Sequence, residues 1–262
     1  MFDFINYGAD QLQMLPLLIL RATGMFVVAP VFGDKAIPKL VKIGLLILLS
    51  LILLSSLNLP PLPQAESSWQ LAGLAVKELL VGLVIGLLFR LLFMGVLTAG
   101  SMIGYQLGLA MVTVFDASLS SQVSLIGRFW YMMAVVIFLA INGHHMVISA
   151  LADSYAVVPI GGLNCSAAAG DMIIKYTAYL FIIALKVASP IMICLFLTDV
   201  ALGTIAKMVP TMNVFFVGFP IKIAVGFVVI GMSLPIFAYI LERTSSYLDR
   251  ELKLLLLVMG EA

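Results

Sequence analysis

The sequence predicts an all-α, polytopic membrane protein with kinked helices and helical hairpins. Its 262 residues are 63% hydrophobic and only 10% charged, and the mean hydropathy is +1.19. Soluble domains carry about 25% charged residues and cannot bury so much apolar surface. Four stretches also lack any acidic or basic residue for 19 residues or more, namely 43–65, 91–115, 129–152 and 223–241. Each can hold a membrane-spanning helix, which needs about 20 apolar residues.

Three other segments are apolar but less regular. The stretches at about 11–31 and 172–197 have basic residues within them. Residues 70–115 are too long for a single crossing and are rich in glycine. We therefore expect 70–115 to form two helices or a re-entrant hairpin, which gives six or seven segments at membrane depth.

The distribution of lysine and arginine predicts the orientation. The connection 32–42 holds three lysines and is expected to be cytoplasmic, whereas residues 1–20 and the proline-rich loop 60–63 hold none and are expected to be external. Arginines and a lysine near the C-terminus predict that it is cytoplasmic. An external N-terminus and a cytoplasmic C-terminus require an odd number of crossings, so six alternating helices do not fit.

Prolines and charges interrupt the apolar stretches. Five prolines, each removing a backbone donor, are Pro16, Pro30, Pro190, Pro220 and Pro235. Six charged residues in or beside apolar stretches are Arg21, Lys77, Glu78, Arg90, Lys186 and Lys222. A charge at the centre of a membrane helix costs about 2.5–3.5 kcal/mol on insertion scales, so these side chains should face protein, water or a partner. Lys175 and Arg128 fit snorkelling at a helix end, but Arg90 fits it less well.

Glycines at four-residue spacing predict close helix packing. Gly100, Gly104 and Gly108 line up on one face of a helix, and Gly82 and Gly86 form a shorter ridge. Such a ridge lets another backbone approach closely. The packed neighbour is either another part of this chain or another subunit.

An apolar tip follows this ridge and precedes a serine-rich run at 118–124. Its bulky side chains are Met111, Val112, Val114 and Phe115. They can form a hydrophobic constriction that excludes water and ions. The alternative is a helix end capped by Asp116 or Ser118, which the residues alone favour.

No pattern of catalytic, metal-binding or nucleic-acid-binding residues is found. Adjacent His144 and His145 point apart on a helix and are expected in a loop, and Cys165 and Cys194 have no metal-site spacing. The 14 basic and 13 acidic residues leave no basic patch for nucleic acid. We expect a protein without catalytic activity, cofactor or metal.

The segment 201–231 carries the most specific sequence pattern. Its core, 213–222, contains Asn213, Phe215, Gly218, Phe219 and Pro220. It resembles the FliR family of flagellar biosynthesis proteins, components of the bacterial flagellar type III export apparatus. Further matches run in order along the chain from Arg21, and include Glu78, the glycines at 82, 86, 104 and 108, Gln106 and Asp116. Thr211 departs from the glutamine that is frequent there.

The resemblance implies an inner-membrane protein at the flagellar basal body. It implies assembly with FliP and FliQ homologues, and with FlhB-type and FlhA-type components, into a helical channel for unfolded flagellar subunits. The half at about 1–120 is expected to be FliP-like and the half at about 121–262 FliQ-like. A plug loop that closes the channel in this family maps onto 110–116, which favours the constriction over the capped helix end. Family members often have phenylalanine where this chain has Met111 and Val114.

Two alternatives stay open at this point. One is the paralogous export subunit of an injectisome, which has the same architecture and a different cargo. The other is a proton-coupled secondary transporter, suggested by charged residues within apolar stretches and by broken helices. A transporter predicts two halves of matching hydropathy around a polar site, and no such repeat is visible.

Overall fold

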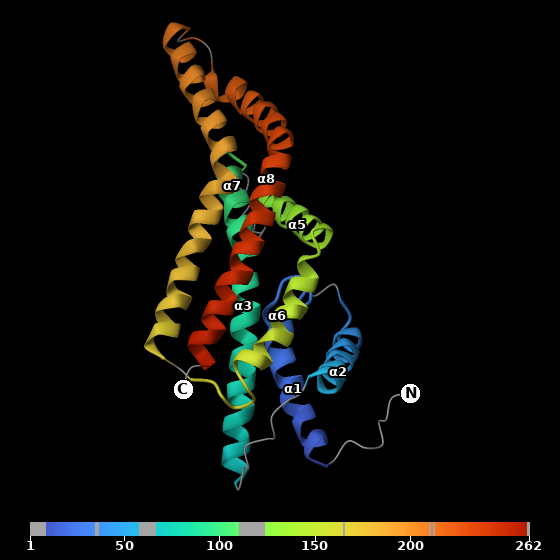
Figure 1. Ribbon diagram of the computed structural model, residues 1–262. Coiled ribbons are helices and arrows are strands. Elements are labelled where there is room, and N and C mark those ends of the chain that lie inside the picture. The colour runs from blue at the N-terminus through green and yellow to red at the C-terminus, as the bar shows by residue number, and fades with distance from the viewer. Residues whose placement is uncertain are drawn as a thin grey trace. The chain divides into compact units, whose positions relative to one another are not determined.

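The computed structural model describes residues 9–34, 37–57, 67–109, 124–164, 166–209, 211 and 213–260 (Figure 1). These ranges form helices joined by turns and short loops, and no strand occurs in them. The helices are α1 (Ala9–Val28), α2 (Lys39–Ser56), α3 (Ser68–Gln106), α5 (Leu125–Ala140), α6 (Gly143–Val157), α7 (Ala167–Met208) and α8 (Val214–Gly260). The predicted all-α class is confirmed.

The chain divides into two compact units. Unit 1 comprises Met1–Leu91, Asn142–Tyr176 and Ser245–Ala262, and unit 2 comprises Leu92–Ile141 and Thr177–Thr244. The helices α3, α7 and α8 each contribute one part to unit 1 and the other part to unit 2.

Unit 1 is built around α1. Its core is aliphatic and comes from four helices, with Leu18 and Met25 of α1, Val81 and Ile85 of α3, Val147 and Leu151 of α6, and Leu252 and Leu255 of α8. The α1 and α3 backbones are so close that a side chain at Gly82 would meet the Arg21 carbonyl. α2 contacts α1 but leaves large apolar side chains such as Ile43 and Leu48 exposed.

Unit 2 contains the helical hairpin of α7 and α8, the end of α3, and α5. Aromatic rings join these helices. The ring of Phe93 lies edge-on to that of Phe138, with 5.3 Å between centroids, and Trp130 contacts Phe237 at 4.4 Å. The first half of α8, which contains Pro220 and Pro235, turns along its length (Figure 1).

Two predicted element boundaries are wrong. Residues 70–106 form one continuous helix instead of two helices or a hairpin. The helix contains no proline, and most of its glycines lie against a neighbouring backbone or side chain instead of marking a break. Conversely, the stretch 129–152 is broken at Asn142, which adopts a left-handed conformation with φ of 58°. Asparagine tolerates this conformation better than most residues. His144 and His145 therefore lie in the first turn of α6, and not in a loop.

The described residues contain fewer helices of membrane-spanning length than the six or seven segments predicted from hydropathy. Within the described ranges, α2, α3, α7 and α8 are long and apolar enough to cross a membrane, and α5 with α6 makes a fifth if the broken pair is one span. α3, α7 and α8 have 39, 42 and 47 residues, about twice the length that a bilayer needs. The orientation and the odd number of crossings stay predictions.

Candidate functional site

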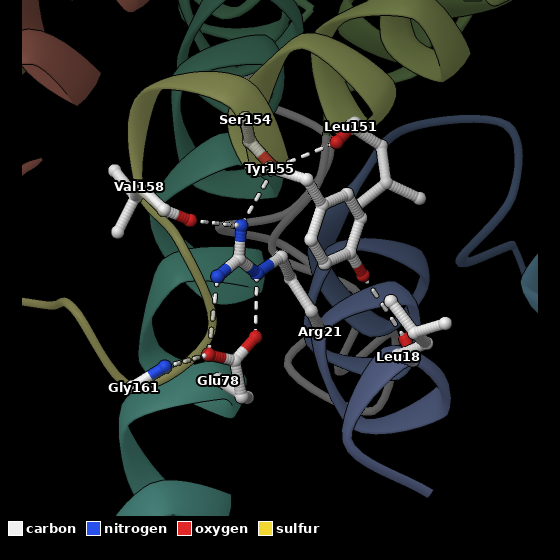
Figure 2. A network of polar contacts seen from close by, with 8 residues as sticks. All are labelled: Leu18, Arg21, Glu78, Leu151, Ser154, Tyr155, Val158 and Gly161. Atoms are coloured by element: carbon white, nitrogen blue, oxygen red, sulfur yellow. Dashed lines mark hydrogen bonds and ion pairs between the residues drawn. The ribbon is translucent and has the colours of Figure 1, made fainter. Parts of the chain in front are cut away.

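A buried ion pair joins α1 to α3 in unit 1 (Figure 2). Arg21 Nε donates to Glu78 Oε2 at 2.7 Å, and Arg21 Nη2 donates to Glu78 Oε1 at 3.1 Å. The side chains are 0% and 1% exposed. Two parallel hydrogen bonds between a guanidinium and a carboxylate hold both groups in a fixed orientation.

Residues of α6 and the loop after it complete this network. Arg21 Nη1 donates to Ser154 Oγ at 3.1 Å and to the Val158 carbonyl at 3.0 Å, while the Gly161 N–H donates to Glu78 Oε1 at 2.9 Å. The ring of Tyr155 lies against the guanidinium, 4.1 Å from its centroid (Figure 2). Because the arginine and the carboxylate are both bonded from several sides, the network holds helices together and offers no free group for chemistry.

Small residues allow the helices to approach around this network. A side chain at Gly86 would meet the Met25 carbonyl at 2.7 Å, and one at Gly24 would meet the Leu79 carbonyl at 2.5 Å. Lys77 Nζ, next to Glu78 in the sequence, donates to the Gly161 carbonyl at 3.1 Å from an exposed position. Gly82 and Gly86 thus face α1 of the same chain.

A second polar network joins three helices of unit 2. Asp199 of α7 pairs with Lys222 of α8, with 2.8 Å between Nζ and Oδ1, and accepts a hydrogen bond at Oδ2 from Gln106 Nε2 of α3 at 3.0 Å. The side chains of Lys222 and Asp199 are 19% and 38% exposed. This network links the last turn of α3 to both helices of the hairpin.

The end of α3 has the geometry of a Schellman motif. The Leu109 N–H donates to the Gly104 carbonyl at 3.2 Å, and the Gly108 N–H donates to the Tyr105 carbonyl at 3.0 Å. Gly108 has φ of +79°, a conformation that favours glycine at a helix end. Gly108 therefore ends the helix, and the prediction that it continues a helical ridge with Gly100 and Gly104 is wrong.

Gly100 and Gly104 lie against the start of α5. A side chain at Gly100 would meet Gly127 Cα at 2.6 Å, and one at Gly104 would meet Ser124 Oγ. Ser124 also caps α5, because its hydroxyl accepts a hydrogen bond from the Gly127 N–H. The two glycines therefore face α5 within unit 2.

The family-like motif forms the start of α8. Asn213 precedes the helix, and its side-chain oxygen accepts a hydrogen bond from the Phe216 N–H at 3.5 Å, as a cap does. Gly218 is buried, and the half-buried ring of Phe219 lies 3.2 Å from where a side chain at Gly108 would begin. Pro220 lies inside the helix, and the side chain of Phe215 is outside the described part. The motif thus lies beside the end of α3.

The candidate constriction residues Met111, Val112, Val114 and Phe115 lie outside the described residues. The structure describes the chain up to Leu109 and again from Ser124. The interpretation of 110–116 as a constriction stays a prediction.

Two of the predicted charged residues lie on the surface of long helices. Arg90 is exposed near the middle of α3 and has no hydrogen bond or ion pair to any residue in the described part of the chain. Lys186 is exposed near the middle of α7, and its Nζ lies 5.7 Å from the ring centroid of Tyr179. Among the described residues no group of three or more histidine, cysteine or acidic side chains is placed to hold a metal ion.

Sequence reasoning missed several partners in these networks. Asp199 lies just beyond the apolar stretch 172–197, and an acidic residue within a long apolar helix is a signal that would have found it. Ser154 and Tyr155 carry no such signal, because hydroxyl side chains are common in membrane helices.

Comparisons with known proteins identify the family of this chain. The family model described as bacterial export proteins, family 1, matches residues 12–247. The flagellar biosynthetic protein FliR of Bacillus subtilis (strain 168) is 33% identical over 261 residues, which cover 98% of this chain and 99% of that protein. FliR of Escherichia coli (strain K12) is 31% identical over 228 residues, 87% of each chain. FliR of Pectobacterium carotovorum subsp. carotovorum is 33% identical over 228 residues, 86% of each. The chain belongs to the bacterial export proteins, family 1, the family of the flagellar biosynthetic proteins FliR.

Proposed function

We propose that this membrane protein is a non-enzymatic subunit of the flagellar type III export gate in the bacterial inner membrane. It joins FliP and FliQ homologues in a channel for unfolded flagellar subunits, next to FlhB-type and FlhA-type components at the basal body. It also helps to keep this channel closed. Similarity to flagellar relatives over nearly the whole chain supports a flagellar role over an injectisome role.

The observation that carries this proposal is the exposed apolar surface of the α7 and α8 hairpin. Large apolar side chains are exposed along both helices, among them Phe181, Phe196, Phe216, Phe227 and Met232. Lipid can cover about 20 residues of each helix, and the helices have 42 and 47. The remainder needs protein partners, because apolar surface of this extent is not stable in water.

The charged networks support a structural role over catalysis or solute transport. Arg21 and Glu78 form hydrogen bonds with each other, and Asp199 pairs with Lys222 and accepts a hydrogen bond from Gln106. A transporter site needs polar groups that are open to a solute and to protons. Here the charges hold helices to one another.

The closing role is supported by the end of α3. Gly108 and the Gln106–Asp199 hydrogen bond hold this end against the hairpin, and the candidate constriction begins at Met111, three residues after Gly108. A constriction needs flanking residues that are held in place, so that its bulky side chains stay in the channel.

Co-expression with tagged FliP and FliQ homologues tests the assembly. We expect one complex that contains all three proteins, identified by native mass determination in detergent. Recovery of this chain as a stable monomer, with FliP and FliQ in a separate complex, would contradict the proposal.

Ion conductance of the assembled complex in a planar bilayer tests the closing role. Replacement of Met111–Phe115 by glycine and serine should open a leak, because the bulky apolar side chains that exclude water are lost. Replacement of Ser118 and Ser120 by glycine is the matched control and should leave the membrane tight. Equal conductance of the two variants would exclude 110–116 as the constriction.

A further inference from the structure

Four of the basic residues in or beside the apolar stretches fall into two classes. Arg21 and Lys222 are each paired with a carboxylate of this chain, Glu78 and Asp199. Arg90 and Lys186 are exposed, and neither forms an ion pair with a described residue. The carboxylates of Glu78 and Asp199 are thus already paired with other cations.

Lys186 lies in an exposed apolar stripe on α7. The stripe repeats every three or four residues and consists of Ile182, Leu185, Lys186, Ser189, Ile193 and Leu197, which we call the Lys186 stripe. The opposite face of the helix is buried within the chain, through Ile183, Val187 and Ile191. The stripe is therefore the side of α7 that this chain does not cover.

Lipid alone does not suit this stripe. The apolar run continues for 10 residues before Lys186 and 12 residues after it, whereas a snorkelling lysine reaches past roughly four residues at 1.5 Å rise each. A bilayer centred on Lys186 therefore leaves its charge in hydrocarbon. A bilayer placed over the later half of α7 leaves Phe181 and Ile182 outside the hydrocarbon, 60% and 46% exposed. The first placement leaves the charge of the stripe without a partner, and the second leaves Ile182 of the stripe exposed to water. Protein over the stripe resolves both.

The charge of Lys186 indicates which side chain the covering protein must provide. A lysine ammonium has three donors and no acceptor, and its contact with Tyr179 is long at 5.7 Å. The two other cations described above are each satisfied by a carboxylate at 2.7–2.8 Å. An apolar helix that covers the stripe must likewise bring a negative charge to Lys186, because a buried unpaired charge is strongly unfavourable.

We infer that the Lys186 stripe is the contact surface for an apolar helix of a neighbouring subunit, and that a carboxylate of this helix pairs with Lys186. The inference rests on the proposed function, which supplies the neighbouring subunits. It adds the position of the contact and the chemistry of the partner.

Co-expression with tagged FliP and FliQ homologues tests the inference through variants of Lys186. Lys186→Glu should lower the recovered complex at least tenfold, since two carboxylates would then face each other. Lys186→Met should also lower it, because the partner carboxylate is left unpaired, and Lys186→Arg should retain it. The matched control is Lys175→Glu, an exposed lysine near the start of the same helix, which should leave recovery unchanged.

The outcomes separate the inference from the proposed function. If the unchanged chain does not assemble with FliP and FliQ, the proposed function fails and the inference fails with it. If the unchanged chain assembles and Lys186→Glu or Lys186→Met assembles equally well, only the inference is overturned. The melting temperature of each variant chain alone in detergent reports on folding. If Lys186→Glu lowers the melting temperature of the chain alone, the yield of the complex with Lys186→Met tests the inference instead. Recovery of the Lys186→Glu complex by changing one partner acidic residue to lysine would identify the carboxylate.

Discussion

Arg21 and Glu78 are 57 residues apart in the sequence, and their side chains form a two-bond ion pair that is shielded from solvent. The pair fixes α1 against α3, and its remaining hydrogen bonds reach α6 and the following loop. Its two charges are stable in an apolar surrounding only as long as both are present.

Removal of one partner of this pair should therefore be strongly destabilising. We expect Glu78→Ala or Arg21→Ala to lower the free energy of unfolding by about 3–5 kcal/mol, because a buried charge is left without its counter-ion. Thermal unfolding in detergent measures the effect. Lys253→Ala is the control, since Lys253 and Asp153 form a pair that is about half exposed and worth about 0–1 kcal/mol. A loss for Glu78→Ala or Arg21→Ala that is no larger than the loss for Lys253→Ala would contradict a buried pair.

Gly82→Ala and Gly73→Ala should act in opposite directions, although both lie in α3. A methyl group at Gly82 would collide with the Arg21 carbonyl, so we expect a loss of about 1–3 kcal/mol. At Gly73 no atom lies within 4 Å of the added carbon, and replacement should stabilise the helix by about 0.5–1 kcal/mol. Melting temperatures of the two variants test this. A tolerated Gly82→Ala would mean that α1 and α3 are farther apart.

Asp199→Ala should destabilise unit 2 more than the double change Asp199→Ala with Lys222→Met. The single change leaves the ammonium of Lys222 without its counter-ion, at a cost of about 1–3 kcal/mol, whereas removal of both groups leaves no unsatisfied charge. Asp171→Ala is the control on the same helix, since this aspartate is exposed. Additive losses in the double variant, measured by thermal unfolding, would rule out the ion pair.

Arg90→Glu should weaken assembly without unfolding the chain. Arg90 is exposed near the middle of α3. Reversal of its charge therefore leaves the contacts within this chain intact and disturbs the contact with a neighbouring subunit that covers it. The yield of the complex with FliP and FliQ homologues, relative to the melting temperature of the chain alone, measures this. Arg128→Glu provides the comparison, because Arg128 lies in the first turn of α5, where a negative charge is favourable. A similar yield for both variants would argue that Arg90 faces no partner.

The helical class and the need for charge partners follow from the sequence, but the pairings do not. Hydropathy and the low charge content suffice to predict long apolar helices, and the cost of intramembrane charge predicts that Arg21 and Glu78 must be satisfied. Their mutual pairing depends on tertiary contacts that span 57 residues, and the Ser154 contact spans 133. No local sequence pattern indicates which residues pair when they lie so far apart in the sequence.

Element boundaries could be predicted less well than the class, for a physical reason. Glycine weakens a helix in water, which led to a predicted break within 70–115. In α3 the glycines instead allow close approach of neighbouring helices and side chains, and packing outweighs their low helix propensity. The break at Asn142 depends on one left-handed residue inside an apolar run, which hydropathy does not detect.

The division into two units has a consequence for the order of events during synthesis. Unit 1 includes residues 245–262 together with the first 91, whereas every residue of unit 2 precedes 245. The Met259 carbonyl accepts a hydrogen bond from the Asn164 N–H, and Leu252 and Leu256 are buried. Chains fold from the N-terminus as they are made, yet unit 1 needs helix residues that follow 244 to complete its core. All of unit 2 is therefore translated before unit 1 can close.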